Sequence, residues 1–254
     1  MKNLAKEEKS KDKTLANHVY TMDLQSTLLC PMLKASAIYY KKKLVVHNFT
    51  LYNLKTKDGY CYLWNEVEGH VTANEFATII YNFLDTEANI CAGEEVILFS
   101  DGCSYQNRNS TLANALLHLS NKKNITIIQK YLVSGHTQME CDSMHSAIER
   151  KLRNREIYSP ACYISACKEA CKKPYKVKYL RHNFFLNFSK LRFYNSIRPG
   201  SKPGDPTVTD LRALQYLPNF KNNYKIDFSE EWKLLEKIII RNKNTNHSET
   251  IEAL

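Results

Sequence analysis

The hydrophobic pattern of this chain changes its period near residue 72, and that change limits the possible folds more than any other feature. Before it, residues 18–25, 44–52 and 60–67 are runs of β-branched and aromatic side chains, which are typical of strands. Lys57-Asp58-Gly59 joins the second run to the third, and an Asp-Gly step between two such runs favours a hairpin. The first part of the chain is therefore predicted to form antiparallel strands.

After residue 72, helical and strand-like segments alternate. Thr72 and Glu75 form a capping box, and apolar residues then recur at helical spacing to residue 84. The apolar run 95–100 ends at Asp101-Gly102 and predicts a buried strand. Three further elements are expected: a helix after Ser110, a strand over 124–131, and a helix capped by Thr137 and Glu140 that ends near Arg153.

The order β-β-β-α-β-α-β-α predicts an α/β fold, with a mixed five-stranded sheet and helices on both of its faces. Residues 15–158 are expected to form the main domain, and 159–236 a small basic helical and β extension. The ends, 1–14 and 237–254, are expected to be a disordered tail and a flexible tail. Smaller features are expected as follows: a helical turn at 35–40, a helix near 160–171, a loop at 201–206 and a strand at 224–228.

The positive charge of the chain is concentrated in one segment. The 254 residues carry a formal charge of +10, yet residues 150–202 alone hold 14 Lys and Arg against two Glu. Aromatic residues such as Tyr175, Tyr179 and Phe185 are interleaved with the basic ones. A near-neutral body with one strongly basic segment favours a polyanion, and nucleic acid above acidic lipid. A solvated basic face over ordinary core aromatics remains the alternative.

Two aspartates end apolar strands where one edge of a sheet could bring them together. Asp23 lies near the end of the first run and Asp101 ends the fourth. Clustered carboxylates are costly unless a cation neutralises them, and oxygen ligands with open positions suit Mg²⁺ or Mn²⁺. A third acid could come from the helix after the fifth strand, on the polar stripe formed by Asp142, His145, Ser146 and Glu149. Each aspartate alone is more often a turn or cap residue, but together they fit one architecture.

Three segments containing these acids carry a family resemblance. They are Met22-Asp23-Leu24-Gln25, the Ser-Asp-x-Cys-x-x-Gln-Asn-x-Asn string at 100–109, and the Gly-His-x-x-Met-Glu-x-Asp string at 135–142. Together with the element order, they resemble the ribonuclease-H-like catalytic core of DDE/DDD transposases and retroviral integrases. The nearest likeness is to an uncharacterised transposon-derived domain family that is common in animal genomes. The resemblance runs from about residue 18 to residue 232.

The resemblance implies a nuclear, DNA-processing enzyme with two Mg²⁺ or Mn²⁺ ions, possible homo-oligomerisation on DNA, and phosphodiester cleavage or strand transfer as its reaction. Asp23, Asp101 and Asp142 match the metal-binding triad, with Glu149 or Glu140 as alternatives for the third acid. Four more residues are expected to line the site: Gln25, Gln106, Asn107 and His136. The residues expected to hold DNA phosphates are Arg150, Lys151, Arg153, Arg155, Lys172, Lys173, Lys176 and Lys178.

A second hypothesis belongs to another class: an inactive, domesticated or truncated transposase remnant that binds nucleic acid without turnover. It is favoured by the short segment before the first strand, because transposases of this type are expected to carry an N-terminal DNA-recognition region. No structural zinc site is expected, since Cys162-x₄-Cys167-x₃-Cys171 lacks an obvious fourth ligand. The charged N-terminus and the absence of a long apolar stretch predict an intracellular protein that is neither secreted nor membrane-bound.

Overall fold

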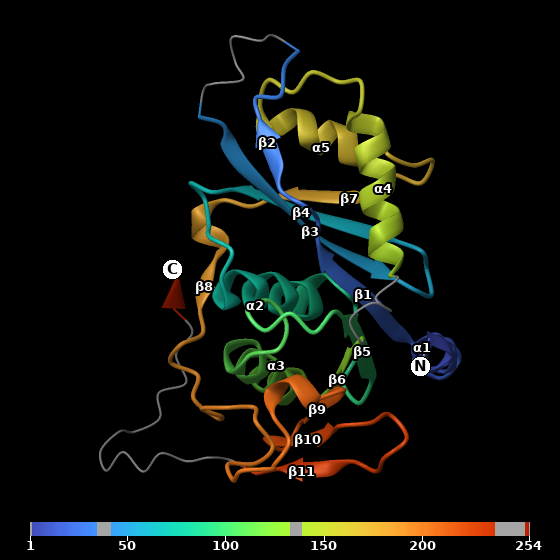
Figure 1. The fold of residues 1–254 in the computed structure, drawn as a ribbon, viewed down its shortest axis with the longest axis vertical. Coiled ribbons are helices and arrows are strands. Elements are labelled where there is room, and N and C mark those ends of the chain that lie inside the picture. Colours follow the sequence, from blue (N-terminus) through green and yellow to red (C-terminus); the bar gives the residue numbers. More distant parts are fainter. Residues whose placement is uncertain (1, 35–41, 133–138, 237–251, 254) are drawn as a thin grey trace. The chain divides into compact units, whose positions relative to one another are not determined.

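The computed structural model describes residues 2–34, 42–132, 139–236 and 252–253. The chain forms two compact units. Unit 1 consists of Met1–Val19, Val71–Thr137 and Asn183–Leu254, and unit 2 of Tyr20–His70 and Gln138–His182. Each unit combines helices with strands of both directions, so the predicted α/β class is correct (Figure 1).

Unit 2 is built on a mixed sheet in the order β1-β3-β4-β7, with β2 also paired to β3. The predicted β3–β4 hairpin is present: the two strands pair antiparallel across the connection at residues 54–58, and Gly59 is already the first residue of β4, opposite Tyr52. β1 and β2 are antiparallel to β3, whereas β7 is parallel to β4. The bounds of these strands are β1 His18–Leu24, β2 Leu28–Cys30, β3 Leu44–Asn53, β4 Gly59–Asn65 and β7 Lys176–Tyr179.

Two helices, α4 (Glu140–Leu152) and α5 (Pro160–Lys168), pack on this sheet (Figure 1). Met144, Ile148 and Leu152 of α4 lie in one buried cluster with Val46 of β3 and Leu63 of β4. These apolar residues recur every fourth residue and form one face of α4, which the polar stripe borders. The packing therefore fixes which side chains of α4 lie beside β1.

Unit 1 contains the predicted alternation of helices and strands. Thr72 and Glu75 form the predicted capping box of α2, and β5 and β6 are parallel. Three strands from the region after residue 200 pair antiparallel in the order β6-β9-β10-β11. The bounds are α2 Ala73–Asn82, the π-helical turn Phe83–Glu87, β5 Glu95–Ser100, α3 Ser110–Lys123, β6 Thr126–Tyr131, β8 Leu186–Asn187, β9 Ala213–Leu217, β10 Lys221–Lys225, β11 Lys233–Leu235 and β12 Glu252–Ala253, with 3₁₀ turns at His182–Phe184 and Val208–Asp210.

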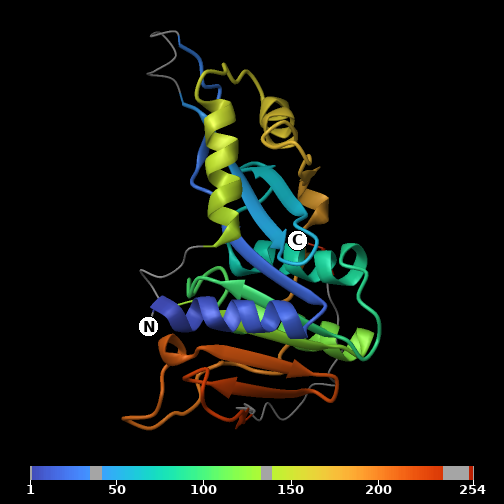
Figure 2. The ribbon, with the colours of Figure 1, turned by 90° about the vertical axis from the view of Figure 1, so that its right-hand side faces the viewer.

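Helix α1 (Lys2–Leu15) occupies the segment that was predicted to be a disordered tail. It lies beside the strands of unit 1 (Figure 2), and its Glu8 and Asp12 carboxylates each contact Lys130 Nζ of β6 at 2.6 Å. Lys130 and Asp12 are buried, so this is a partly desolvated ion-pair network. The helix is held by contacts from a distant strand, which its own polar sequence could not reveal.

The extension predicted over 159–236 is not a separate body. Its first part contributes α5 and β7 to unit 2, and its later part contributes β8 to β11 to unit 1. The predicted strand at 224–228 lies earlier, at Lys221–Lys225, and the helix predicted to reach residue 171 ends at Lys168. In the predicted C-terminal tail, Glu252 and Ala253 pair with β8.

The turn predicted at 35–40 lies outside the described residues, as does most of the tail at 237–254. Within the described ranges, no helix has both the length and the apolar character needed to cross a membrane.

Candidate metal centre

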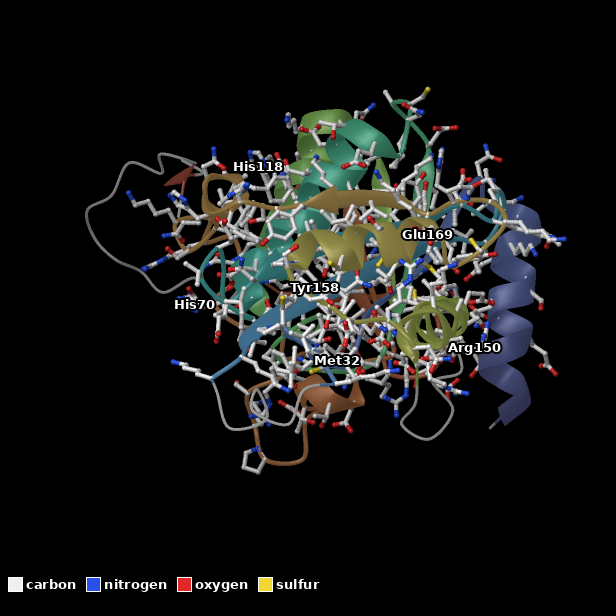
Figure 3. The ribbon with its side chains drawn as sticks, turned by 90° about the horizontal axis from the view of Figure 1, so that it is seen from above. Met32, His70, His118, Arg150, Tyr158 and Glu169 are labelled. Atoms are coloured by element: carbon white, nitrogen blue, oxygen red, sulfur yellow. The ribbon has the colours of Figure 1, made fainter. Side chains whose placement is uncertain are left out.

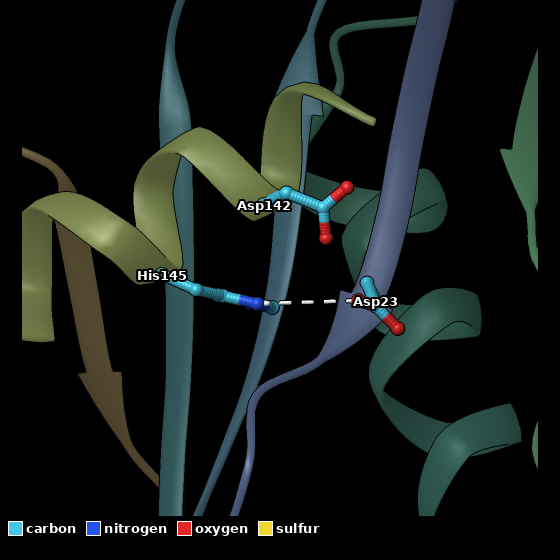
Figure 4. A group of neighbouring side chains, drawn as sticks. All are labelled: Asp23, Asp142 and His145. Atoms are coloured by element: carbon cyan, nitrogen blue, oxygen red, sulfur yellow. Dashed lines mark ion pairs between the residues drawn. The ribbon is translucent and has the colours of Figure 1, made fainter. Parts of the chain in front are cut away.

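Asp23, Asp142 and His145 form a cluster in unit 2 (Figure 4). Each offers one ligand atom, and these three atoms lie within 4.8 Å of one another. An ion about 2.1 Å from each ligand atom holds those atoms roughly 3 to 4 Å apart, so shifts of less than about 1 Å would close the cluster around it. The group is the kind of three-residue site that binds one divalent cation and leaves positions open.

Asp23 is positioned by the pairing of β1 with β3. It lies opposite Thr50 in the antiparallel register, and its side chain is 20% exposed. Its Oδ1 accepts a hydrogen bond from the Leu24 backbone N–H at 2.8 Å. Its Oδ2 lies 3.9 Å from His145 Nδ1. One carboxylate oxygen is therefore fixed by the backbone while the other faces the imidazole.

Asp142 lies in the first turn of α4, which begins at Glu140. The predicted start at Thr137 lies outside the described residues. Asp142 Oδ2 accepts a hydrogen bond from the Met139 backbone N–H at 2.8 Å, so this carboxylate caps the helix. The partial positive charge of a helix N-terminus stabilises an anion there. Asp142 is therefore held near the cluster by the same contact that begins the helix.

Thr50 determines which nitrogen of His145 carries the proton. The Thr50 hydroxyl donates its single hydrogen to the Asp23 carbonyl oxygen at 3.1 Å, and it lies 2.8 Å from His145 Nε2. We therefore assign Nε2–H as the donor to Thr50, which leaves the lone pair of neutral His145 on Nδ1. That lone pair faces the Asp23 carboxylate, and a cation between two such groups stabilises the arrangement.

Burial lowers the pKa of His145, against the opposing effect of the Asp142 and Glu149 carboxylates. A lowered pKa favours the neutral imidazole, which is the form that binds metals. The sequence placed His145 on the polar stripe of α4 but not among the ligands. Its spacing of three residues from Asp142 was the signal, because residues at i and i+3 share a helix face.

The alternative third acids are outside the cluster. Glu149 Oε1 lies 3.5 Å from Gln25 Nε2, and Gln25 Oε1 accepts a hydrogen bond from Asn48 Nδ2 at 2.9 Å. Buried Gln25 thus contacts Glu149. Glu140 is the first residue of α4 and is not among the clustered groups. Of the three acids considered, Asp142 is the one found beside Asp23.

Asp101 follows β5 in unit 1 and is not part of the cluster. Its Oδ1 accepts hydrogen bonds from Asn107 Nδ2 at 2.9 Å and from the Cys103 backbone N–H at 3.3 Å. Buried Asn107 therefore orients Asp101, as a residue lining the site would.

Gln106 is also buried, but its amide donates to the Tyr105 hydroxyl. His136 lies outside the described residues. Convergence of Asp101 with Asp23 stays a prediction.

The basic residues expected to bind DNA all lie in unit 2, and some of them make ion pairs whereas others do not. Lys151 and Arg155 contact Glu169, and Lys173 and Lys176 contact Asp58. Arg150 and Arg153 make no ion pair within the described ranges. They line a surface hollow with Ser146 and Glu149, and Figure 3 shows Arg150 on the α4 side of the molecule. These two guanidinium groups, together with exposed Lys172, make no ion pair within those ranges and are available to a polyanion.

Comparison with known families decides the classification. The model of the family described as Domain of unknown function (DUF8701) matches residues 31–182, more than half of the chain. The chain belongs to DUF8701. The matched range includes Asp101, Asp142 and His145, whereas Asp23 precedes it. No curated protein and no solved structure matches this DUF8701 chain.

Proposed function

We propose that this DUF8701 protein is a metal-dependent enzyme that cleaves or transfers phosphodiester bonds in DNA. The observation that supports this most strongly is the convergence of Asp23, Asp142 and His145 within 4.8 Å. Two of the three residues belong to the motifs that resemble DDE/DDD transposases and integrases. The imidazole nitrogen in the set favours Mn²⁺ over Mg²⁺, because carboxylate and water oxygens alone are the usual ligands of Mg²⁺.

The residues of the cluster have separable roles in this proposal. Asp23 and Asp142 supply negative charge to the cation, and His145 supplies a neutral nitrogen that Thr50 orients. A bound divalent cation lowers the pKa of a coordinated water and neutralises charge on a phosphate oxygen. By the resemblance, Asp101 completes the set with a second ion, and Asn107 holds its carboxylate in one orientation.

DNA is the proposed partner, held by phosphate contacts to Arg150 of α4 and to Arg153, which caps the C-terminal end of that helix. On the helix, Arg153 follows Asp142 by 11 residues, or about 16 Å along the axis. A nuclear location and homo-oligomerisation on DNA are proposed on the resemblance alone.

Metal binding tests the proposal directly. Isothermal titration of Mn²⁺ into the wild-type protein should show binding that Asp142→Asn and His145→Gln each weaken by more than about tenfold. Glu149→Gln is the matched control on the same helix and should keep the wild-type Mn²⁺ affinity. Equal Mn²⁺ affinity in all four proteins would mean that the cluster is not the metal site.

Catalysis is tested separately by nicking of supercoiled plasmid in Mn²⁺. Asp142→Asn should abolish nicking. Asp101→Asn should also abolish it while leaving Mn²⁺ binding at the cluster measurable. If wild-type protein binds Mn²⁺ but never nicks DNA, the enzyme proposal fails and the metal site stands.

The second candidate function is a nucleic-acid-binding module without turnover. The available guanidinium groups of Arg150 and Arg153 favour it, because they require no metal chemistry. This module would bind DNA equally well in EDTA and in Mn²⁺, and Asp142→Asn would leave its DNA affinity unchanged. A wild-type protein that nicks DNA would exclude this candidate.

A further inference from the structure

Two cysteines that are distant in sequence belong to one part of unit 2, where β2 and α5 pack in the same apolar cluster. Cys30 ends β2, and Cys162 lies in the first turn of α5. Both belong to one apolar cluster, in which Cys30 is buried and Cys162 packs against it from the rim. A disulfide requires Cα atoms no more than about 7 Å apart, so only cysteines that pack in one part of a fold can form one.

Three hydrogen bonds hold the segments that carry these thiols. Met32 and Ile157 exchange two backbone hydrogen bonds, each of 2.8 Å. The Tyr163 hydroxyl donates to the Leu29 carbonyl oxygen at 2.6 Å. Leu29 directly precedes Cys30, and Tyr163 directly follows Cys162. The contacts therefore bracket both cysteines.

The segments around Cys30 and Cys162 are partly exposed to solvent. Met32 is 37% exposed and Tyr158 is 65% exposed, and Figure 3 shows both on the same side of unit 2. Cys162 is partly exposed, whereas Cys30 is 4% exposed. A small oxidant can thus reach the outer thiol, with the inner one behind it.

The two thiols differ in reactivity. Backbone N–H groups of Ser159 and Tyr158, before the start of α5, lower the pKa of Cys162. Burial, and then the neighbouring Cys162, raise the pKa of Cys30. The thiolate is the nucleophilic form of cysteine, so Cys162 is the thiol that reacts first. Cys61 and Cys167 lie deeper in the same cluster and are fully buried.

We propose that Cys30 and Cys162 are an oxidisable pair that a peroxide converts to a disulfide, with Cys162 as the attacking thiol. The Cys162 thiolate attacks one peroxide oxygen, forming a sulfenic acid and releasing hydroxide, which takes up a proton as water. The Cys30 thiol then attacks the sulfenic sulfur, the S–S bond forms, and the second oxygen leaves as water. Two thiols are oxidised and one peroxide is reduced. The bond would link β2 to the start of α5.

The test uses the full-length protein treated with limiting hydrogen peroxide and mapped without reduction. Trypsin leaves Cys162 and Cys167 on one peptide, so chymotryptic cleavage after Tyr163 is needed to separate them. The expected product is a peptide containing Cys30 joined to one containing Cys162, lost on reduction. In Cys30→Ser, dimedone should trap sulfenic acid at Cys162, and in Cys162→Ser the linked peptide should be absent.

Exposed Cys91 of unit 1 provides the control, because it lies in the other unit. Iodoacetamide should modify Cys162 about tenfold faster than Cys91 at neutral pH. Cys91→Ser should leave the Cys30–Cys162 linkage intact. The proposal is overturned if peroxide links other cysteines in preference, or if dimedone labels Cys91 and not Cys162 in Cys30→Ser.

Discussion

At the scale of single residues, Thr50 connects two of the candidate metal ligands. Its hydroxyl bonds both the Asp23 carbonyl oxygen and His145 Nε2. Thr50→Val keeps the shape of the side chain and removes this hydroxyl, so the imidazole is no longer held with Nδ1 toward Asp23. Residues that orient a ligand typically contribute a factor of 10–100 to metal affinity, and we expect a loss of about tenfold in Mn²⁺ affinity by isothermal titration.

Thr21→Val is the matched control for this prediction. Thr21 is also fully buried in unit 2, but its hydroxyl lies 3.4 Å from Cys141 Sγ and not beside a ligand. It should keep the Mn²⁺ affinity of the wild type. A comparable loss in both variants would show that removing any buried hydroxyl disturbs the cluster.

The candidate site was only partly predictable from sequence, for a reason visible at individual residues. Asp23 and Asp142 stood out because each is an acid beside an apolar pattern. His145 was passed over because its spacing of three residues from Asp142 shows only that the two share a helix face, and two solvated residues can share a face as well. Its role depends on the register of β1 with β3, which places Thr50 opposite Asp23, and no local pattern encodes that register.

At the scale of secondary-structure elements, α1 depends on one lysine of β6. Lys130 contacts Glu8 and Asp12 and is 8% exposed. Lys130→Met would leave the Asp12 carboxylate buried without its cation. Removing one partner of a buried pair typically costs about 3 to 5 kcal/mol, and because Glu8 is partly exposed we expect a loss of about 3 kcal/mol in urea denaturation.

Lys122→Met is the corresponding control in unit 1. Lys122 contacts Asp85 at 2.6 Å, but the lysine side chain is 49% exposed. Exposed ion pairs contribute about 0 to 1 kcal/mol, so this substitution should change the free energy of unfolding by less than about 1 kcal/mol. Equal effects of the two substitutions would contradict the burial argument.

His47 of β3 should make the stability of the folded protein depend on pH. Burial lowers the pKa of His47, whose ring lies 5.2 Å from that of Trp64, while Glu66 acts in the opposite direction. The unfolded chain then binds the proton more tightly than the folded one, so stability falls as the pH drops below about 6.5. His47→Phe should reduce this fall between about pH 7.5 and 5.5 in urea denaturation. An identical pH profile in the variant would contradict it.

The elements with a strong internal pattern were predictable and those held by distant partners were not. The β3–β4 hairpin has its Asp-Gly step where β4 begins, and α2 has its capping box. Helix α1 lacks an apolar periodicity and is held by Lys130, more than 110 residues away. Strands β9 to β11 likewise extend the sheet from β6, and the strand predicted at 224–228 overlaps β10 but begins three residues too late.

At the scale of the whole molecule, the basic surface predicts salt-dependent DNA binding. We expect log K against log[salt] to slope near −3 to −4, which corresponds to about four phosphate contacts. Arg150→Ala/Arg153→Ala should make this slope shallower by about 2, because each lost contact removes about 0.9. Fluorescence anisotropy with a labelled duplex measures both quantities.

Lys151→Ala/Arg155→Ala removes the same charge from the same region and serves as the control. These two side chains contact Glu169 and are less available to DNA. Their removal should change the slope less than that of the arginine pair. If both double variants change the slope equally, DNA binding depends on the net charge of unit 2 and not on the hollow on α4.

The division of unit 2 between two separate stretches of sequence has a consequence during synthesis. The strands β2, β3 and β4 leave the ribosome before α4 and α5, which cover them, and residues 71–137 come between. At about 5 to 20 residues per second, that interval lasts roughly 3 to 13 s. For that time Val46, Cys61 and Leu63, which α4 later buries, face solvent on the nascent chain. The growing polypeptide therefore presents an apolar sheet face to chaperones before its own helix is made.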